Sequence, residues 1–455
     1  MRSAHVPAGW SVDSWRDRPV HQAVEYSDAD SVRRAAQRLR ELPPLVTSGE
    51  IEHLREHVAQ AQRGDRFLLH GGDCAESFAE CTPDVITNKL KILLQMSLVL
   101  VHGLKQPVTR VGRFAGQYAK PRSNAIETRE IGGKVVSLPS YFGDSINGYA
   151  FDPVSRKPDP ERMIAAHLHA AMTLNFVRAL VDGGFADIHH PENWNVSLFG
   201  SARLTDEQRS QYEAMTSKLA DGLRFMQALG EKSASDVARV EFFTSHEGLN
   251  LEYESAHTRR VPRRDWHYNL STHMPWIGNR TRDINAAHIE YFRGVRNPVG
   301  VKLGADTSPD EVRAIADALN PDDESGRLVL ITRVGAGKVR LLAPVIESVK
   351  DKNVLWVCDP MHGNTQSVAS GIKTRRFDDV ITELMQTIEL HESLGTRLGG
   401  ISCELTGEDV TECVGGASGV TEDGLHQNYA SPCDPRLNYQ QALELSFTLA
   451  RRLGR

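Results

Sequence analysis

Eight strand-like runs recur along the chain from residue 66 onward, and most of them alternate with stretches of helical pattern. Alternating strands and helices form parallel sheets, and eight such units close into a (β/α)₈ barrel. We therefore predict an α/β protein of the TIM-barrel class. The eight runs are "RFLLHGGDC" (66–74), "PVTRVGRFAG" (107–116), "VEFFTSHEG" (240–248), "NLSTHMPWIG" (269–278), "PVGVKLG" (298–304), "RLVLITRVG" (327–335), "NVLWVCDPMHG" (353–363) and "GGISCELTG" (399–407).

Each run ends in residues that can bind a ligand or carry out chemistry. In a closed parallel barrel all eight carboxyl ends meet at one mouth, so residues far apart in sequence become neighbours there. We expect the functional site at that mouth. The residues concerned are, in chain order, Cys74, Arg113, Glu247, Trp276 with Arg280, Lys302, Arg333, His362 and Glu404.

Two segments fall outside the regular strand and helix alternation. The gap between Arg113 and Glu247 is 247 − 113 = 134 residues, far more than one βα unit needs, so we predict inserted helices at about 159–235, between the second and third barrel strands. Residues 1–65 are predicted to form an N-terminal extension, an arm followed by helices at 31–42 and 50–63. Residues 66–455 are then the catalytic barrel.

The insertion is predicted to contain one helix over 159–183 and another within 204–230, where a capping box precedes apolar residues at helical spacing. These apolar side chains either pack against the outside of the barrel or form a surface for a partner subunit or effector, and the sequence does not separate the two. They are Tyr212, Met215, Leu219, Leu223 and Met226.

The composition of the chain argues against several classes of partner and scaffold. The formal net charge is −6 and the basic residues are scattered, which argues against a nucleic-acid partner. We see no apolar run near the roughly 18 residues of a membrane span and no signal peptide, so we expect a cytoplasmic protein without a membrane partner. Six cysteines without a CxxC pair argue against a disulfide scaffold or a zinc ribbon.

Three of the strand-end residues, together with Asp434 just after the last strand, form a mixed set of metal ligands. A thiolate, an imidazole and two carboxylates suit a divalent transition ion such as Mn²⁺, Co²⁺, Fe²⁺ or Zn²⁺. Any one of them alone would more often be structural, and their convergence at one barrel mouth is what favours a metal site. The residues are Cys74, His362, Glu404 and Asp434.

A set of cations accompanies these ligands. Lys302 and Arg333 interrupt apolar strands, where an unpaired charge is too costly to keep without an anion. Several cations facing one pocket indicate a substrate with several negative charges, such as phosphates and carboxylates. For Arg282 and Lys338 we expect an ordinary solvated surface. The other members of the set are Arg113, Lys120, Arg122 and Arg280.

Long motifs then identify a resemblance that runs from about Gly9 to the C-terminus. The chain resembles the type II, plant-like 3-deoxy-D-arabino-heptulosonate 7-phosphate (DAHP) synthases. The motifs that carry this resemblance are "GGDCAESF", "RFAGQYAKPRS", "SHEGLNLEYE", "WIGNRTR", "NPVGVKLG", "CDPMHGNT", "ELTGEDVTEC" and "CDPRLN". This resemblance implies a transferase that condenses phosphoenolpyruvate with erythrose 4-phosphate on a metal-dependent barrel and releases phosphate, the first step of the shikimate pathway.

The resemblance also implies roles for individual residues. Cys74, His362, Glu404 and Asp434 would bind the metal, with Mn²⁺ or Co²⁺ expected first and Zn²⁺, Fe²⁺ or Cd²⁺ as alternatives. Phosphoenolpyruvate would be held by Arg113, Arg280, Lys302 and Arg333, beside Trp276 and Asn279, and the sugar phosphate by Lys120, Arg122 and Ser123. Proton transfer would fall to Glu247 or to a water on Lys302, with His362 also in the catalytic set. The family further implies a homodimer or homotetramer and aromatic amino acids as effectors.

The sequence departs from the family pattern beside the expected site. Asn279 stands where a Glu is usual, Ser402 where a His is usual, and Ser431 and Pro432 where a Thr and another residue are expected. Three readings follow: a DAHP synthase that tolerates these changes, a relative acting on another aldehyde such as an amino-sugar phosphate in secondary metabolism, or a non-catalytic regulatory protein that binds metabolites.

Overall fold

The core of the protein is a closed barrel of eight parallel strands. The computed structural model describes residues 7–183, 205–207, 209–214, 217 and 241–454. The strands lie in the order β5-β2-β1-β14-β11-β10-β9-β8. They are β1 (Phe67–Gly72), β2 (Val108–Arg113), β5 (Phe243–Thr244), β8 (Trp276–Ile277), β9 (Val299–Leu303), β10 (Leu328–Thr332), β11 (Val354–Cys358) and β14 (Leu398–Glu404).

Backbone hydrogen bonds join the two outermost strands of this order. Met274 N donates to Thr244 O (3.2 Å), Trp276 N donates to His246 O (3.0 Å), and Gly248 N donates to Trp276 O (3.0 Å). The same region forms a parallel bridge between Glu247 and Trp276. All eight predicted strands are therefore present, and the predicted barrel class is confirmed.

Side chains on alternate positions of the strands divide between two cores. One set, which includes Leu68, Val111, Val329 and Leu355, packs together in the barrel interior. The other set, which includes Phe67, joins the larger core between the strands and the surrounding helices. This is the alternation that a pleated strand produces when both of its faces are buried.

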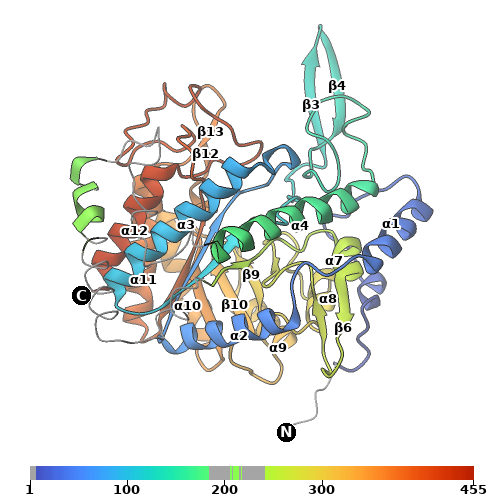
Figure 1. Ribbon diagram of the computed structural model, residues 1–455, viewed down its shortest axis with the longest axis horizontal. Coiled ribbons are helices and arrows are strands. Elements are labelled where there is room, and N and C mark those ends of the chain that lie inside the picture. The colour runs from blue at the N-terminus through green and yellow to red at the C-terminus, as the bar shows by residue number, and fades with distance from the viewer. Residues whose placement is uncertain (1–6, 184–204, 208, 215–216, 218–240, 455) are drawn as a thin grey trace.

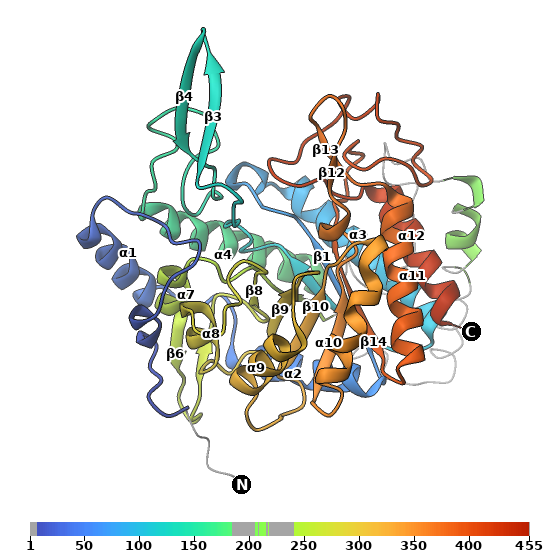
Figure 2. The same cartoon turned by 180° about the vertical axis from the view of Figure 1, so that it is seen from behind.

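Helices cover the outside of the barrel (Figure 1 and Figure 2). The long helices α3 and α12 pack against each other on one side, and α11 lies beside them. The helices after the insertion are α7 (Leu251–His257), α8 (Ala287–Phe292), α9 (Pro309–Leu319), α10 (Leu342–Ser348), α11 (Phe377–Ser393) and α12 (Tyr439–Leu453), with α3 (Pro83–Leu104) between β1 and β2.

Short elements complete the connections. Two-stranded antiparallel pairs form between β6 (Thr258–Arg260) and β7 (His267–Asn269), and between β12 (Gln366–Ser367) and β13 (Lys373–Thr374). The 3₁₀ helices are η1 (Ser14–Asp17), η2 (Phe78–Glu80), η5 (Ala336–Leu341) and η6 (His362–Asn364).

The two helices predicted before residue 65 are present as α1 (Ala29–Glu41) and α2 (Ser48–Arg63). Helix α2 begins with a capping box between Thr47 and Glu50 and ends at Gly64, which has a φ of +86°. Its buried face, Leu54, Val58 and Ala61, packs onto the interior side chains of the barrel strands.

Helix α2 therefore closes the amino-terminal end of the barrel. Arg55 donates to Arg296 O, just before β9, and Gln62 contacts Gly326 before β10 and Asn353 before β11. The helix lies along the foot of the barrel, away from the carboxyl ends of the strands (Figure 1). The N-terminal segment is thus part of the barrel's packing, while the predicted boundary at residue 65 stays a prediction.

The predicted insertion lies between β2 and β5. Its first helix is present as α4 (Glu161–Asp182), and the second predicted helix falls mostly outside the described residues, although Tyr212 is described and is buried. The sequence interpretation missed a hairpin in this region. Strands β3 (Ile126–Ile131) and β4 (Lys134–Pro139) pair antiparallel and project from the body of the molecule (Figure 1).

Two of these helices, α3 and α4, are long and apolar enough to cross a membrane by length and composition alone. Both pack on the protein: 67% of the most apolar window of α3 and 39% of that of α4 are buried. Buried core helices of a barrel have this character. The expectation that the protein has no membrane partner stays a prediction.

Candidate active site

A polar cavity of about 630 Å³ opens at the carboxyl ends of the barrel strands. Most of the sequence-predicted site residues line it: Lys120, Arg122, Ser123, Glu247, Asn279, Arg280, Lys302, Arg333, His362 and Asp434. The other four predicted residues, Cys74, Arg113, Trp276 and Glu404, are at most 1% exposed and lie beneath them. Residues spread over more than 300 positions of sequence are thus brought to one place, as the barrel topology requires.

The four predicted metal ligands come together. Ligand atoms of Cys74, Glu404 and Asp434 all lie within 4.8 Å of one another. The Nε2 of His362 is 2.9 Å from Oε1 of Glu404, and the Sγ of Cys74 is 3.7 Å from Oδ2 of Asp434. Their burial ranges from complete for Cys74 and Glu404 to partial for Asp434.

Ion pairs outside the cavity hold the two loops that carry Cys74 and Asp434. Asp73 lies just after β1 and is fully buried; its carboxylate pairs with Lys89 at 2.6 Å and with Arg436 at 2.8 Å. Arg436 follows Asp434 by two residues and also pairs with Glu412 at 3.0 Å. Through Arg436, the buried carboxylate of Asp73 therefore links the loop that carries Cys74 to the loop that carries Asp434.

Asp359 orients His362. Its Oδ2 is 2.7 Å from Nδ1 of His362, and its Oδ1 accepts the backbone N–H of the same histidine at 3.2 Å. A carboxylate on Nδ1 fixes the tautomer in which Nε2 is unprotonated, and Nε2 is the nitrogen that faces Glu404. Burial lowers the pKa of His362, although the nearby carboxylates of Asp359 and Glu404 oppose the shift.

Arginines hold Glu404. Arg375 donates to its Oε2 at 2.7 Å and Arg113 to its Oε1 at 3.0 Å. Burial alone would raise the pKa of Glu404, but His362, Lys120 and Arg375 together hold it well below its usual range. Arg375 also reaches Thr365 and the carbonyl of Pro435, so one buried guanidinium connects three loops of the site.

Lys120 shows that this group of ligands attracts a cation. Its ammonium is 2.7 Å from Cys74 Sγ, 2.9 Å from Asp434 Oδ2 and 3.4 Å from Glu404 Oε1. Burial would lower the pKa of Lys120, but these three partners raise it well above its usual value. A cysteine sulfur, an imidazole and two carboxylates around a cationic position are a donor set that suits a divalent transition ion.

The cations that we predict to bind substrate lie around the same position. Lys302 pairs with Asp359 at 2.9 Å, and Arg113 and Lys302 both lie over the ring of Trp276, at 5.0 and 5.6 Å from its centroid. Trp276 is 1% exposed, so it acts as a platform beneath the cavity. At the rim, Arg280 donates to the hydroxyl of Ser123 at 2.8 Å.

Several buried polar atoms here lack a hydrogen-bond partner within the described part of the chain. They belong to the guanidinium of Arg113 (Nε and Nη1), to Arg333 (Nε), to Glu247 (Oε1) and to Asn279 (Oδ1). Buried donors and acceptors are normally paired, and those that are not mark places where a ligand or water completes the bonding. The donors are predominantly cationic, which fits an anionic ligand.

Two ionisable groups lining the cavity have pKa values moved toward neutrality. Burial raises the pKa of Glu247, although Lys302, Lys120 and Arg113 oppose the shift. Burial also lowers the pKa of Lys302 to about 8, against the attraction of Asp359. A carboxyl and an amine poised in this way can exchange protons with a substrate near neutral pH.

The residues that depart from the family pattern have defined surroundings. Ser402 is fully buried on β14 and its hydroxyl is 3.0 Å from Nδ1 of His70, its register partner on β1. The neighbouring strand β1 therefore places an imidazole, that of His70, beside Ser402. Ser431 donates to the carbonyl of Asp434 at 2.6 Å and so shapes the ligand loop directly.

One sequence expectation about the charges is wrong. Arg282 is only 6% exposed and pairs with Asp306 at 3.2 Å and with Glu311 at 3.0 Å, so it is a buried structural cation and not a solvated one. Its position just past β8 gave no sign of the two acidic partners, which come from later segments. Lys338 is exposed, as expected.

Three residues that contact the predicted metal ligands were not singled out from the sequence. Asp359 and Arg375 are described above, and Lys373 lines the cavity with its ammonium 3.2 Å from Asp434 Oδ1. Asp359 lies three residues before His362 in the "CDPMHGN" turn, which is a signal that local reasoning could have used. No comparable local signal marks Arg375.

Comparison with known proteins agrees with this geometry. The model of the Class-II DAHP synthetase family matches residues 10–450. The chain belongs to this family. It is 47% identical to the phospho-2-dehydro-3-deoxyheptonate aldolase of Neurospora crassa, over 97% of this chain and 94% of that protein. It is also 47% identical to the protein of the same name from Streptomyces coelicolor, over 96% of each chain.

Proposed function

We propose the following roles for the barrel-mouth residues of this class-II DAHP synthase. The enzyme condenses phosphoenolpyruvate with erythrose 4-phosphate and water to give DAHP and phosphate, the first step of the shikimate pathway, as its family membership and its named relatives indicate. The observation that carries the proposal is the convergence of the four predicted metal ligands at one barrel mouth, beside a cavity lined by several cations.

The metal is proposed to bind to Cys74, His362, Glu404 and Asp434. A divalent ion there, Mn²⁺ or Co²⁺ first, would polarise the aldehyde of the sugar phosphate as a Lewis acid. The contacts of Lys120 with three of these ligands are consistent with its ammonium moving toward the substrate when a metal is bound.

The cations are proposed to hold the two anionic substrates. Arg113, Arg333, Lys302 and Arg280 would bind the phosphate and carboxylate of phosphoenolpyruvate, over Trp276 and beside Asn279. Lys120, Arg122 and Ser123 would bind the phosphate of the sugar at the rim. Neutralising both polyanions lets them approach in a fixed geometry that their mutual repulsion disfavours in water.

Glu247 is proposed to handle protons. Attack of the enol carbon on the aldehyde leaves a cationic C2 and an aldehyde oxygen that takes up a proton. Water then adds to C2 and loses a proton, which balances the first, and the hemiketal phosphate passes its hydroxyl proton to the phosphate as the C2–O bond to the phosphate breaks. Glu247 lies in the cavity with an unpaired Oε1 and a raised pKa, so its carboxylate can accept the proton of that water. Lys302, with its lowered pKa, is the alternative acceptor through a bound water.

The test is phosphate release by metal-loaded protein. Release should require both phosphoenolpyruvate and erythrose 4-phosphate and should be lost in His362→Ala. Release with an amino-sugar phosphate in place of erythrose 4-phosphate would show a different aldehyde specificity, and binding of phosphoenolpyruvate without release under any condition would refute catalysis. We further propose a cytoplasmic homo-oligomer that responds to aromatic amino acids; sedimentation and inhibition curves test these two properties.

A further inference from the structure

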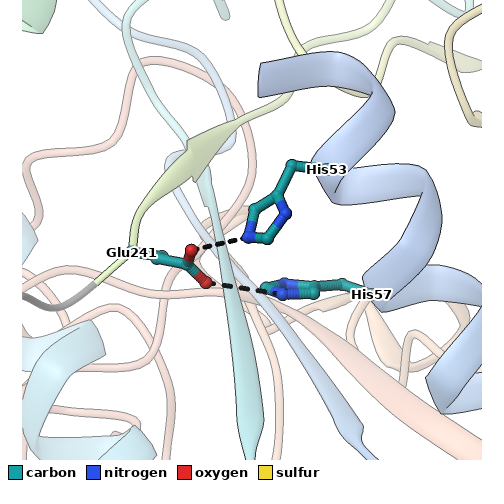
Figure 3. A group of neighbouring side chains, drawn as sticks. All are labelled: His53, His57 and Glu241. Atoms are coloured by element: carbon teal, nitrogen blue, oxygen red, sulfur yellow. Dashed lines mark hydrogen bonds and ion pairs between the residues drawn. The ribbon is translucent and has the colours of Figure 1, made fainter. Parts of the chain in front are cut away.

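A second group of metal-ligating side chains lies at the amino-terminal end of the barrel, opposite the candidate active site. His53 and His57 lie one turn apart on α2, and Glu241 lies two residues before β5 (Figure 3). The Nε2 of His53 is 2.6 Å from one carboxylate oxygen of Glu241, and the Nε2 of His57 is 3.4 Å from the other. One ligand atom of each residue lies within 4.8 Å of the other two.

We propose that His53, His57 and Glu241 bind a Zn²⁺ ion. Two imidazole nitrogens and a carboxylate oxygen are a common zinc donor set, with a solvent molecule completing a tetrahedron. Metal–ligand bonds of about 2.0–2.2 Å place neighbouring ligand atoms of a tetrahedron about 3.3 Å apart. The two histidines now face different oxygens of Glu241, but one ligand atom of each residue already lies within 4.8 Å of the other two, so side-chain rotations would bring the three atoms to that spacing.

The helix holds the two histidines ready for this geometry. Residues four apart lie on the same face of a helix, and the two rings are 4.4 Å apart between centroids. The His57 ring also lies edge-on to Phe243 of β5, with centroids 5.6 Å apart, so its position is set by packing. The Nδ1 of His53 faces Glu56 at 3.7 Å, in the manner of a carboxylate that orients a ligating imidazole.

The surroundings of His57 also favour binding. The ring is 4% exposed, so packing holds it in place. Its Nδ1 has no hydrogen-bond partner among the described residues, so no neighbour fixes the tautomer and Nε2 is free to carry the lone pair. A neutral imidazole is the form that a metal requires.

Two features of the surroundings affect zinc binding at this site, one through access and one through charge. His53 and Glu241 line a cavity of about 420 Å³ between α2, α4 and β5, which gives the ion a route from solvent. Against this, the positive charges of Arg66 and Arg110 act on the cluster and partly offset the attraction of Glu241. Removing the charge of Arg66 should therefore tighten zinc binding at this site, by about threefold or more.

Metal content measured by mass spectrometry tests the proposal. Full-length protein is stripped with chelator, equilibrated with buffered Zn²⁺ and separated from free metal. His53→Gln and Glu241→Gln should each bind one ion fewer per chain than the parent. His21→Gln is the matched control, because His21 has the same 44% side-chain exposure as His53 and also faces a carboxylate, Asp283. Equal metal content in all four proteins would overturn the proposal.

Three further measurements separate this site from the catalytic one. X-ray absorption should show only nitrogen and oxygen around the ion that is lost in His53→Gln, because the ion at the barrel mouth has Cys74 as a sulfur ligand. Zn²⁺ should raise the thermal midpoint of a His362→Ala protein by about 2 °C or more, but not that of His362→Ala combined with Glu241→Gln. Arg66→Gln should lower the dissociation constant of this site alone. A sulfur ligand on the lost ion would overturn the assignment, as would unchanged zinc affinity in Arg66→Gln.

Discussion

Replacing Asp359 with Asn should weaken metal binding at the barrel mouth, although it leaves all four proposed metal ligands in the sequence. Asp359 is fully buried and accepts from His362 Nδ1 at 2.7 Å and from Lys302 Nζ at 2.9 Å. The amide introduced by Asp359→Asn would donate to Nδ1 and so place the ring proton on Nε2, which is the nitrogen that must be unprotonated to bind metal. Changes in such outer partners lower metal affinity by about 10- to 100-fold, which is about 1.4–2.7 kcal/mol.

The same change leaves Lys302 without its buried counter-charge. Breaking one side of a buried ion pair costs about 3–5 kcal/mol of folding free energy, part of which is recovered because Lys302 loses its proton. Its pKa, already lowered by burial to about 8, should fall further, so that the KM for phosphoenolpyruvate rises at neutral pH. Chelator competition gives the Mn²⁺ dissociation constant, and initial rates across pH give the KM.

Glu254→Gln is the matched control for this experiment. Glu254 is also a buried carboxylate paired with a histidine, His246, at 2.8 Å, but it lies outside the cavity. The Glu254→Gln protein should lose folding stability by a similar amount and keep its Mn²⁺ affinity. An Asp359→Asn protein that binds Mn²⁺ within about twofold of the parent would refute the tautomer argument. Equal loss of affinity in both variants would show a general effect of destabilisation.

Three other predictions follow from the described contacts. Arg375→Met should lower kcat and destabilise the fold by about 3–5 kcal/mol, because it leaves Glu404 with one buried arginine fewer; steady-state rates and denaturant unfolding measure these two effects. Burial lowers the pKa of His167 to about 4 and of His257 to about 3, so the unfolded chain binds more protons below about pH 6.5 and stability falls as the pH is lowered. Each ring should cost about 2 kcal/mol at pH 5, and His167→Gln should flatten that pH dependence in thermal unfolding. Chelation should abolish phosphate release while shifting the thermal midpoint little, because Lys120 compensates the ligand charges; in Lys120→Met the same chelation should cause a clear drop.

The barrel was predictable because its signals are local. Each strand carries its own apolar run and turn residues, and parallel closure then brings the strand ends together whatever lies between them. The hairpin of β3 and β4 also has a local signal that was missed: two glycines with positive φ, Gly132 and Gly133, separate two short strands. Its mostly exposed side chains hide the usual alternation of burial.

The residues that contact the site residues were harder to predict from the sequence. Arg375 sits in a run of basic residues after β13, and only the folded chain brings it against Glu404, Thr365 and Pro435. The surroundings of Arg282 were likewise set by acidic residues from later segments. In both cases the sequence shows a charge, and long-range packing decides whether it is solvated, structural or part of the site.

The way the barrel closes has a consequence for communication across the molecule. Strands β5 and β8 contain only two residues each, and a few backbone hydrogen bonds join them. Glu247 and Trp276 pair at this narrow seam, and β5 is also the first strand after the insertion. A movement of the chain before β5 would therefore reach Glu247, the carboxyl that we propose to accept a proton, and its neighbour Trp276 through a few peptide units. The shortest strands of the barrel, β5 and β8, thus connect the insertion to the proposed site.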